Sequence, residues 1–252
     1  MKSIKTNTMS LIGELKGVCH IKTDKLASNA IANMKRGLPV LKSPIASHNG
    51  HCAILGGGHS LKENISHAFS LPCKKVAIGS THDYIIDQGY IPDIYVCIEA
   101  ATNACEFIKK PHKDIKYYIS SCTDSSTLDA LKGYDVTLFH IYELDGINQD
   151  MIINGGSTVG SRACFLINTL GYSFFHLFGL DSSFKGDKVH CYDTNNPNYK
   201  FIDVIANNRV FKTLPQWLTQ VKDFQDIIKF HNDIMKFIVY GDGLLQHALK
   251  GN

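Results

Sequence analysis

Residues 51–64, HCAILGGGHSLKEN, contain a strand pattern and a helix pattern joined by three glycines. The apolar run HCAIL is typical of a buried strand, a helical pattern starts at SLKEN, and Gly56, Gly57 and Gly58 join the two. Glycines let backbone N–H groups approach a phosphate closely, and the first helical turn offers unpaired donors and the positive end of its dipole. We therefore predict a phosphate-binding turn in which Ser60 caps the helix and donates its hydroxyl to the ligand. The alternative is a tight turn that serves packing alone.

Short apolar runs rich in β-forming residues continue to alternate with helical patterns up to about residue 181. The runs VAIG, YVCI and FFHLFG are continuously apolar, which is typical of parallel strands buried on both faces. We therefore predict an α/β fold: a doubly wound, mostly parallel, Rossmann-like sheet with helices on both faces. Later patterns predict a helix at residues 214–231, a strand at KFIVYG and a final helix at GLLQHALK.

The first 48 residues have a different pattern. A mixed helical pattern runs from about Leu11 to Met34, and the stretch RGLPVLKSP then disfavours continued helix. We expect residues 1–48 to form an N-terminal helical appendage and residues 49–252 to form the Rossmann-like nucleotide-binding domain. Residues 182–208 are polar, rich in Asn and too long for an ordinary connection, which is typical of functional lids or mobile segments.

Composition narrows the classes of partner. The 252 residues include 26 Lys and Arg against 23 Asp and Glu, which gives a formal net charge of +3. A charge this small predicts neither a nucleic-acid groove nor a polybasic membrane patch. The start of the chain has no apolar run of signal-peptide length, and no later stretch approaches the ~18 apolar residues of a membrane span. We therefore expect a cytoplasmic protein without a transmembrane segment.

The eight cysteines and twelve histidines show no metal-binding spacing. There is no Cys-x-x-Cys pair and no His-Glu-x-x-His motif, and most cysteines lie inside apolar segments, where a thiol packs as a small hydrophobe. We expect reduced, structural cysteines and no zinc site.

A second glycine-opened helix is predicted at residues 154–171, NGGSTVGSRACFLINTLG. Gly155 and Gly156 precede Ser157 and Thr158, whose hydroxyls would bind an anion together with the backbone amides of the first helical turn. Both glycine openings follow predicted strands, so both should lie at the carboxyl edge, where open α/β sheets bind ligands. We predict that the two openings share one anionic ligand. The alternative is a well-capped core helix.

Polar side chains follow three further predicted strands. A carboxylate at a strand end, as at Asp181, can hold Mg²⁺ or position a hydroxyl, and a histidine such as His190 can donate or accept a proton. These two residues are the catalytic candidates, with a turn cap and a solvated loop histidine as the alternatives. Ser80 and Thr81 are candidates for contacts to a ribose or base, and Glu99 is a candidate metal ligand, although caps and turns use the same residue types.

The order of these segments resembles one family throughout. The segments ILGGGHSL, THDYIIDQGYIPDIYVCIE, GGSTVGSRACFLINTLGYSFFHLFGLDSSF, VHCYD and YGDGLL, from about Gly50 to Leu245, are similar to the MptE-like domain. That domain occurs in archaeal 6-hydroxymethylpterin diphosphokinase and in bacterial motility accessory factors that help to glycosylate flagellin. More distantly, the GxG-x-Ser-Leu opening and the helix before LGYSFFHLFGLD resemble the bacterial family-42 sialyltransferases, which use a CMP-sugar and a catalytic histidine.

The chain departs from these families at two positions. His59 replaces the proline that commonly precedes the serine of the phosphate turn, and Gly57 stands where the sialyltransferases usually have an asparagine that contacts the donor or acceptor. His190 falls in the region where those enzymes keep their general base.

The resemblance implies a nucleotide-dependent transferase, and three hypotheses follow. The first is a glycosyltransferase-like enzyme of surface-glycan or flagellin modification, with a nucleotide-sugar donor and a glycan or protein acceptor. In it, His190 deprotonates the acceptor hydroxyl and Asp181 orients that histidine or binds a metal. The second is ATP- and Mg²⁺-dependent diphosphoryl transfer to a pterin alcohol, with Asp181 and Glu99 near the metal. The third is a non-catalytic nucleotide-binding accessory protein. The sequence leaves the nucleotide base and homo-oligomerisation open.

Overall fold

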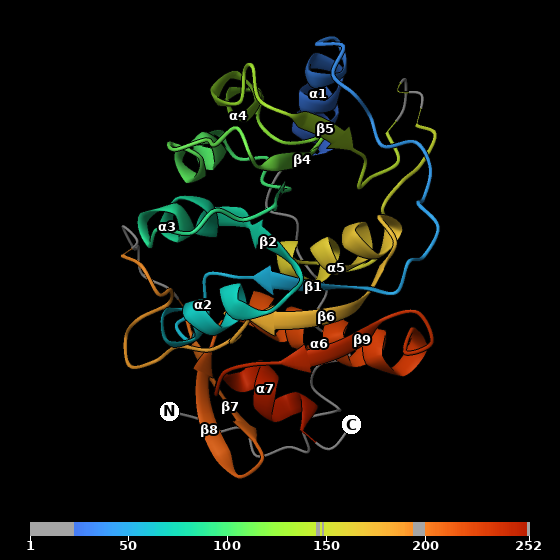
Figure 1. Ribbon diagram of the computed structural model, residues 1–252. Helices are drawn as coiled ribbons and strands as arrows, with labels where there is room; N and C mark the ends of the chain where they lie inside the picture. Colours follow the sequence, from blue (N-terminus) through green and yellow to red (C-terminus); the bar gives the residue numbers. More distant parts are fainter. Residues whose placement is uncertain (1–22, 145–146, 148, 194–199, 251–252) are drawn as a thin grey trace.

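A seven-stranded sheet forms the centre of the protein (Figure 1). The computed structural model describes residues 23–144, 147, 149–193 and 200–250. The strand order is β5-β4-β3-β2-β1-β6-β9, and every neighbouring pair is parallel, which confirms the predicted doubly wound α/β sheet. The strands are β1 (Gly50–Leu55), β2 (Lys74–Ile78), β3 (Ile94–Cys97), β4 (Lys116–Ser120), β5 (Val136–Phe139), β6 (Tyr172–Phe178) and β9 (Lys236–Val239).

Helices cover both faces of the sheet because each strand is apolar on both sides. In β1, Cys52 and Ile54 join one core cluster, and Ala53 and Leu55 join the other. The first cluster also contains residues of α1 (Thr23–Met34), α5 (Val159–Thr169), α6 (Pro215–Phe230) and α7 (Leu244–Leu249). The second contains residues of α2 (Leu61–Ser70), α3 (His82–Asp87) and α4 (Ser125–Ala130). The described part of the chain also contains the short 3₁₀ helices Gly79–Thr81 and Thr102–Phe107.

The chain changes direction beside β1. It winds outward from β1 to β5 and then returns through α5 to β6, on the other side of β1 (Figure 1). The register pairs Leu55 with Phe178, so the segments that follow β1 and β6 leave the sheet side by side. The Gly56 amide donates to Phe178 O over 2.8 Å, and the Gly58 amide donates to Gly179 O over 2.7 Å. Open α/β sheets bind ligands at such a switch point.

The end of the long polar stretch is a strand. Residues 182–208 were predicted to form one long polar connection, but β7 (Ile202–Ala206) lies within them and pairs antiparallel with β8 (Arg209–Thr213). Asn207 and Asn208 form the turn with φ values of 47° and 61°, the left-handed conformation that a two-residue hairpin requires. The Asn-Asn pair between two β-rich runs was the available signal. Residues 194–199 lie outside the described part of the chain.

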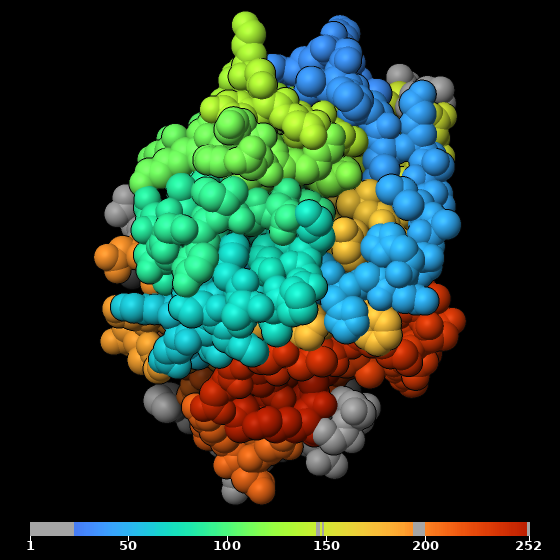
Figure 2. Space-filling model, in the orientation of Figure 1, coloured from blue at the N-terminus to red at the C-terminus, as the bar shows by residue number. Residues whose placement is uncertain are grey.

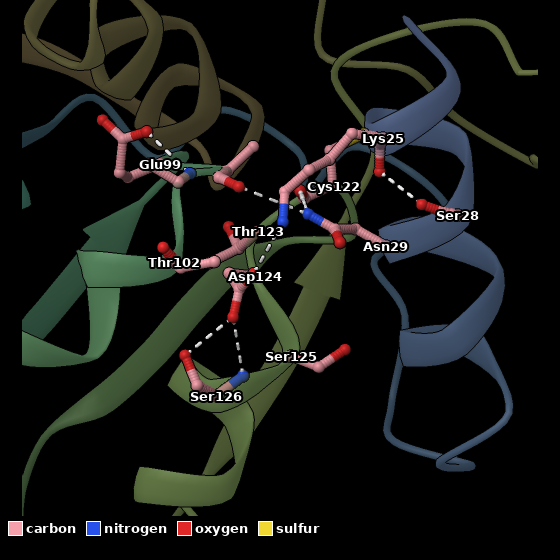
Figure 3. A network of polar contacts seen from close by, with 12 residues as sticks. Lys25, Ser28, Asn29, Glu99, Thr102, Cys122, Thr123, Asp124, Ser125 and Ser126 are labelled. Carbon is pink, nitrogen blue, oxygen red and sulfur yellow. Dashed lines mark hydrogen bonds and ion pairs between the residues drawn. The ribbon is translucent and has the colours of Figure 1, made fainter. Parts of the chain in front are cut away.

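Residues 23–48 pack against the sheet. Asn29 Nδ2 donates to Cys122 O over 3.0 Å, and Asn33 Nδ2 donates to Ser121 O and Thr123 O over 2.9 and 2.7 Å. Figure 3 shows Asn29 reaching from α1 to the segment that follows β4. These bonds satisfy carbonyls that would otherwise be buried without partners.

After α1, the blue segment in Figure 2 runs along the side of the molecule beside α5. The Ile45 amide donates to Thr169 O, and the His48 amide donates to Gly171 O. The boundary at residue 48 stays a prediction, and the part of the predicted helix before residue 23 falls outside the described residues.

None of the helices in the described ranges is long and apolar enough to cross a lipid bilayer. The cysteines of the same ranges are free thiols. Burial raises the pKa of Cys52 and Cys164. A raised thiol pKa keeps the sulfur protonated and unreactive, as expected of structural cysteines.

Candidate functional site

A cavity of about 130 Å³ lies at the carboxyl ends of β1 and β6. It brings together residues that are far apart in the sequence: the glycine turn after β1, the end of β2, the start of α5 and the segment after β6. Its walls are formed by residues 56–58, 78–80, 159–160, 179–183, 189–190, Trp217 and Gln220. The candidate residues Asp181 and His190 therefore lie at the same cavity as the predicted phosphate turn.

The glycines of this turn are required by close packing. A Cβ atom at Gly56 would lie 2.6 Å from Gly179 O, and one at Gly58 would lie against Asp181 Oδ2. A Cβ atom at Gly57 would collide with the hydroxyl of Tyr192. The turn thus fits between the segment after β6 and the segment around Tyr192 only as bare backbone.

Asp181 is a buried carboxylate at the N-terminus of α2. It is 1% exposed, and its Oδ2 accepts a 2.8 Å hydrogen bond from the Ser60 amide. Burial raises the pKa of Asp181, against the opposing effects of His59 and Ser60, which favour its charged form. His59 Nδ1 lies 3.7 Å from Oδ2, so the described contacts pair Asp181 with His59 and not with His190. The predicted role of Asp181 in orienting His190 therefore has no contact to support it.

His190 is oriented by the glycine turn. Its Nδ1 lies 3.2 Å from Gly57 O, and its ring stacks on Tyr192 with ring centres 5.1 Å apart and planes 5° apart. Burial lowers the pKa of His190, which favours the neutral ring. Because a carbonyl oxygen can only accept, the neutral ring must carry its proton on Nδ1, and Nε2 is then the basic nitrogen. This is the protonation state that a general base needs.

Ser80 and Thr81 have different surroundings. Ser80 lines the cavity, and its hydroxyl is hydrogen-bonded to the Tyr192 hydroxyl. Thr81 is fully buried, and its hydroxyl donates to the carbonyl of Leu55 over 3.0 Å and to that of Ile78. Only Ser80 therefore faces the cavity, and Thr81 ties the end of β2 to β1.

The second glycine-opened helix receives a carboxylate from α6. Gly155 and Gly156 have φ values of 99° and 74° and lead into Ser157. The Ser157 amide and hydroxyl both donate to Asp223 Oδ2, and Thr158 Oγ1 donates to Gln220 Oε1 over 2.8 Å. Asp223 thus takes the position in which an anionic ligand was predicted.

The cavity wall contains Val159 and Gly160, the first two residues of α5. The four residues that were predicted to bind the ligand, 155–158, do not line it. A single ligand shared by both glycine openings stays a prediction.

Glu99 follows β3, and its Oε1 accepts a 2.9 Å hydrogen bond from the Ala101 amide (Figure 3). In the sheet, β3 and β6 are separated by β2 and β1, which places the two strands about 14 Å apart at ~4.8 Å per strand. The described residues contain no group of three or more His, Cys, Asp or Glu side chains that could hold a metal ion. Glu99 and Asp181 are therefore not brought together as a joint magnesium site.

Three residues of this region carry no role predicted from the sequence. His59 is only a departure from a family pattern, and the roles of Tyr192 and Asp223 become visible in the structure alone. Their partners lie far away in the sequence: Asp223 is 66 residues from Ser157, and Tyr192 is 112 residues from Ser80. Local spacing carries no signal for contacts of this kind.

Comparisons with known proteins agree with this architecture. Residues 24–187 match the sequence profile described as 6-hydroxymethylpterin diphosphokinase MptE-like. No curated protein sequence gives a match. The fold is similar to that of the MAf glycosyltransferase from Magnetospirillum magneticum AMB-1, with a TM-score of 0.68 and 16% sequence identity. The match covers 90% of this chain and 38% of that enzyme, so the chain spans less than half of its structural neighbour.

At 16% sequence identity, the similarity to this enzyme shows the fold alone. The profile match covers more than half of the chain and confirms the resemblance inferred from the sequence motifs. The chain belongs to the 6-hydroxymethylpterin diphosphokinase MptE-like family.

Proposed function

We propose that the chain is a nucleotide-dependent transferase that moves a glycosyl group from a nucleotide-sugar to a hydroxyl acceptor. The observation that carries the proposal is the hydrogen bond between His190 Nδ1 and Gly57 O. It holds a neutral histidine beside the glycine turn, with Nε2 as its basic nitrogen. A base next to a phosphate-binding turn is the arrangement that transfer to a hydroxyl requires.

The glycine turn would bind the donor phosphate through part of its backbone. The amides of Gly56, Gly58 and Ser60 already donate within the protein, so the amides of Gly57 and His59 would contact the phosphate. The N-terminus of α2 adds the positive end of its dipole. The cavity suits a phosphate or ribose, because pockets for whole drug-sized ligands are typically about 300–1,000 Å³. The rest of the donor would extend along the carboxyl edge past Ser80.

The chemical step would use His190 as the base. As the acceptor oxygen forms its bond to the anomeric carbon, its proton passes to His190 Nε2. The bond between the anomeric carbon and the phosphate oxygen breaks, and the nucleotide leaves with that electron pair. The helix dipole and the turn amides would stabilise the charge that develops on the leaving phosphate.

Diphosphoryl transfer is the second candidate, and the family match favours it. Such a reaction uses Mg²⁺ to neutralise phosphate charge. Mg²⁺ is commonly bound by one or two carboxylates together with substrate phosphates, and Asp181 is the one carboxylate among the described residues of the cavity wall. Among the described residues, Asp181 Oδ1 has no hydrogen-bond partner, so this oxygen would be the atom that coordinates Mg²⁺.

Calorimetry of the full chain with CMP-, UDP- and GDP-sugars and with ATP, each with and without Mg²⁺, distinguishes the two reactions. Glycosyl transfer predicts binding of a nucleotide-sugar and turnover with a hydroxyl acceptor. Binding of ATP alone, strictly dependent on Mg²⁺, would favour diphosphoryl transfer. Binding without turnover that survives both Asp181→Ala and His190→Ala would favour a non-catalytic accessory role.

A further inference from the structure

Ser182, in the wall of the cavity beside the glycine turn, has an unusual backbone conformation. Its φ value is 51°, in the left-handed region that is disfavoured for residues with a side chain. The other non-glycine residues at positive φ in the described ranges are all asparagines, which adopt this conformation more readily. A serine kept in it calls for an explanation, and backbone strain of this kind gathers at functional sites.

Two hydrogen bonds hold Ser182 in this conformation. Thr213 Oγ1 donates to Ser182 O over 2.6 Å, and Gln220 Nε2 donates to Ser182 Oγ over 2.9 Å. Ser182 is 5% exposed and Gln220 is 7% exposed, and both residues line the cavity. The two side chains therefore meet at the cavity wall, in a place that is closed to bulk solvent.

The start of α5 fixes the direction of the hydrogen bond from Gln220. Thr158 Oγ1 lies 2.8 Å from Gln220 Oε1 and 3.1 Å from Ser161 Oγ, so its proton goes to the nearer oxygen, at the usual O–H···O length. Ser161 Oγ donates to Asp223 Oδ2 over 2.6 Å. Because Gln220 Oε1 is thus occupied, the NH₂ group of the same amide faces Ser182.

Ser182 Oγ therefore receives a hydrogen bond and has its own proton left to donate. Among the described residues, none accepts that proton or the second proton of Gln220 Nε2. Trp217 also lines the cavity, and its indole N–H makes no hydrogen bond within the same part of the chain. The free polar groups of these three side chains are all donors, and they suit a ligand group that accepts.

The same cavity, of about 130 Å³, is bordered by the glycine turn. The Gly57 amide belongs to this turn and has no acceptor among the residues that the structure describes. The lining residues include no Lys or Arg, so a ligand would meet neutral donors on both walls. Neutral donors can hold an oxyanion away from bulk solvent, because hydrogen bonds to a charged acceptor are roughly twice as strong as neutral ones.

We propose that Ser182 and Gln220 form the second half of the phosphate site beside the glycine turn, and that Ser182 Oγ and Gln220 Nε2 both donate to phosphate oxygens of the ligand. Thr158 is a positioning residue, because it orients the Gln220 amide. The second glycine-opened helix thereby contributes to the site without touching the ligand. The identification of this phosphate as that of the sugar donor rests on the proposed glycosyl transfer.

The test uses the chain's only tryptophan, Trp217, whose fluorescence reports on the cavity that it lines. The full chain is titrated with sodium phosphate, and with sodium chloride at equal ionic strength. Phosphate should change the emission in a saturable way, and chloride should not. Ser182→Ala should weaken phosphate binding about tenfold, the effect of losing one hydrogen bond.

Ser182→Gly separates the hydroxyl from the backbone strain. Glycine adopts a φ of 51° readily, so this variant should unfold at a higher urea concentration than Ser182→Ala. It should bind phosphate as weakly as Ser182→Ala does, because both variants lack the hydroxyl. A purely structural role for Ser182 predicts the reverse, with binding recovered together with stability.

Gln220→Glu keeps the shape of the amide but replaces its NH₂ group by an acceptor. The Ser182 hydroxyl should then turn to the new carboxylate, and phosphate binding should be about tenfold weaker than in Ser182→Ala because a second donor is lost. Ser173→Ala is the matched control, because Ser173 is a buried serine near the start of β6 and does not line the cavity. This variant should bind phosphate as the unaltered chain does.

Three results would overturn the proposal: phosphate binds neither by fluorescence nor by calorimetry, Ser182→Ala binds it as tightly as Ser173→Ala, or Ser182→Gly binds it as tightly as the unaltered chain. Turnover of a nucleotide-sugar with an unchanged donor KM in Ser182→Ala would refute this inference and leave the proposed glycosyl transfer standing. Phosphate binding that depends on Ser182, without turnover of any nucleotide-sugar, would refute the transferase and keep the phosphate site.

Discussion

The Asp223 carboxylate accepts hydrogen bonds from both the backbone amide and the hydroxyl of Ser157, each 2.7 Å long. Helix α6 thereby supplies an anion to the N-terminus of α5, just as Asp181 supplies one to the N-terminus of α2. Each glycine-opened helix therefore holds a carboxylate of the protein itself, and a ligand phosphate must use the donors that remain.

Replacing Asp223 should expose an anion site. Asp223→Ala leaves the amide and hydroxyl of Ser157 without their acceptor, and it should lower the free energy of unfolding by about 1–2 kcal/mol, the usual effect of losing a helix cap and its charge. Sulfate should restore part of the loss by binding at the vacated position. Urea unfolding with sodium sulfate, compared with sodium chloride at equal ionic strength, measures both effects.

Asp226→Ala is the control for Asp223→Ala, because Asp226 forms its ion pair with Lys222 of the same helix. It should change stability little, with no more response to sulfate than the unaltered chain. Equal behaviour of the two variants would refute a capping role for Asp223.

The burial of Asp181 should make stability depend on pH. Its pKa is raised in the folded protein, so the folded state binds the proton more tightly than the unfolded state does. The associated stability is fully present below the unfolded pKa, about 3.9, and is lost as the pH rises through the raised folded pKa. Asp181→Asn lacks this dependence and can still accept from the Ser60 amide.

Urea unfolding of both proteins between pH 3.5 and 7, a range chosen to span the ordinary pKa of about 3.9, checks this prediction. The unaltered chain should lose stability relative to Asp181→Asn across the range. A constant difference would mean that Asp181 does not titrate with a raised pKa.

His190 should control the acidic limb of the pH–rate profile. Burial lowers its pKa, so the basic form should persist below the ordinary histidine value of about 6.5. We expect kcat/KM to rise with pH through a midpoint below that value. His190→Asn keeps a donor for Gly57 O but has no base, and kcat should fall about 10²–10⁴-fold with donor affinity retained. Unchanged turnover would exclude His190 as the base.

Gly57 and Tyr192 should be coupled. The closest atom to a Cβ at Gly57 is the Tyr192 hydroxyl oxygen, so Gly57→Ala should displace Tyr192 and the His190 ring stacked on it. We expect kcat to fall about tenfold or more, because small displacements of a base impair proton transfer. Tyr192→Phe removes the colliding oxygen, so the double variant should recover part of the rate. Strictly additive effects of the two substitutions would contradict this contact.

Local patterns were sufficient to predict the sheet and the edge at which the candidate site lies. The apolar strands, the glycine turn at Gly56–Gly58 and the cap at Thr158 each depend on neighbours within a few residues, as in the Thr158–Ser161 capping box. The Asn207–Asn208 hairpin could also have been predicted from its residues.

Periodicity and the conformational needs of glycine act over short distances, so the amino-acid sequence alone indicates which strands are buried on both faces and where the chain turns tightly. Which charges meet depends on how distant segments pack. Asp181 reaches Ser60 across 121 residues and Asp223 reaches Ser157 across 66, through the packing of β6 beside β1 and of α6 on α5. Hydrogen bonds and burial depend on distance in space, and the cavity lined by Gly57, Asp181 and His190 exists only once those elements have packed.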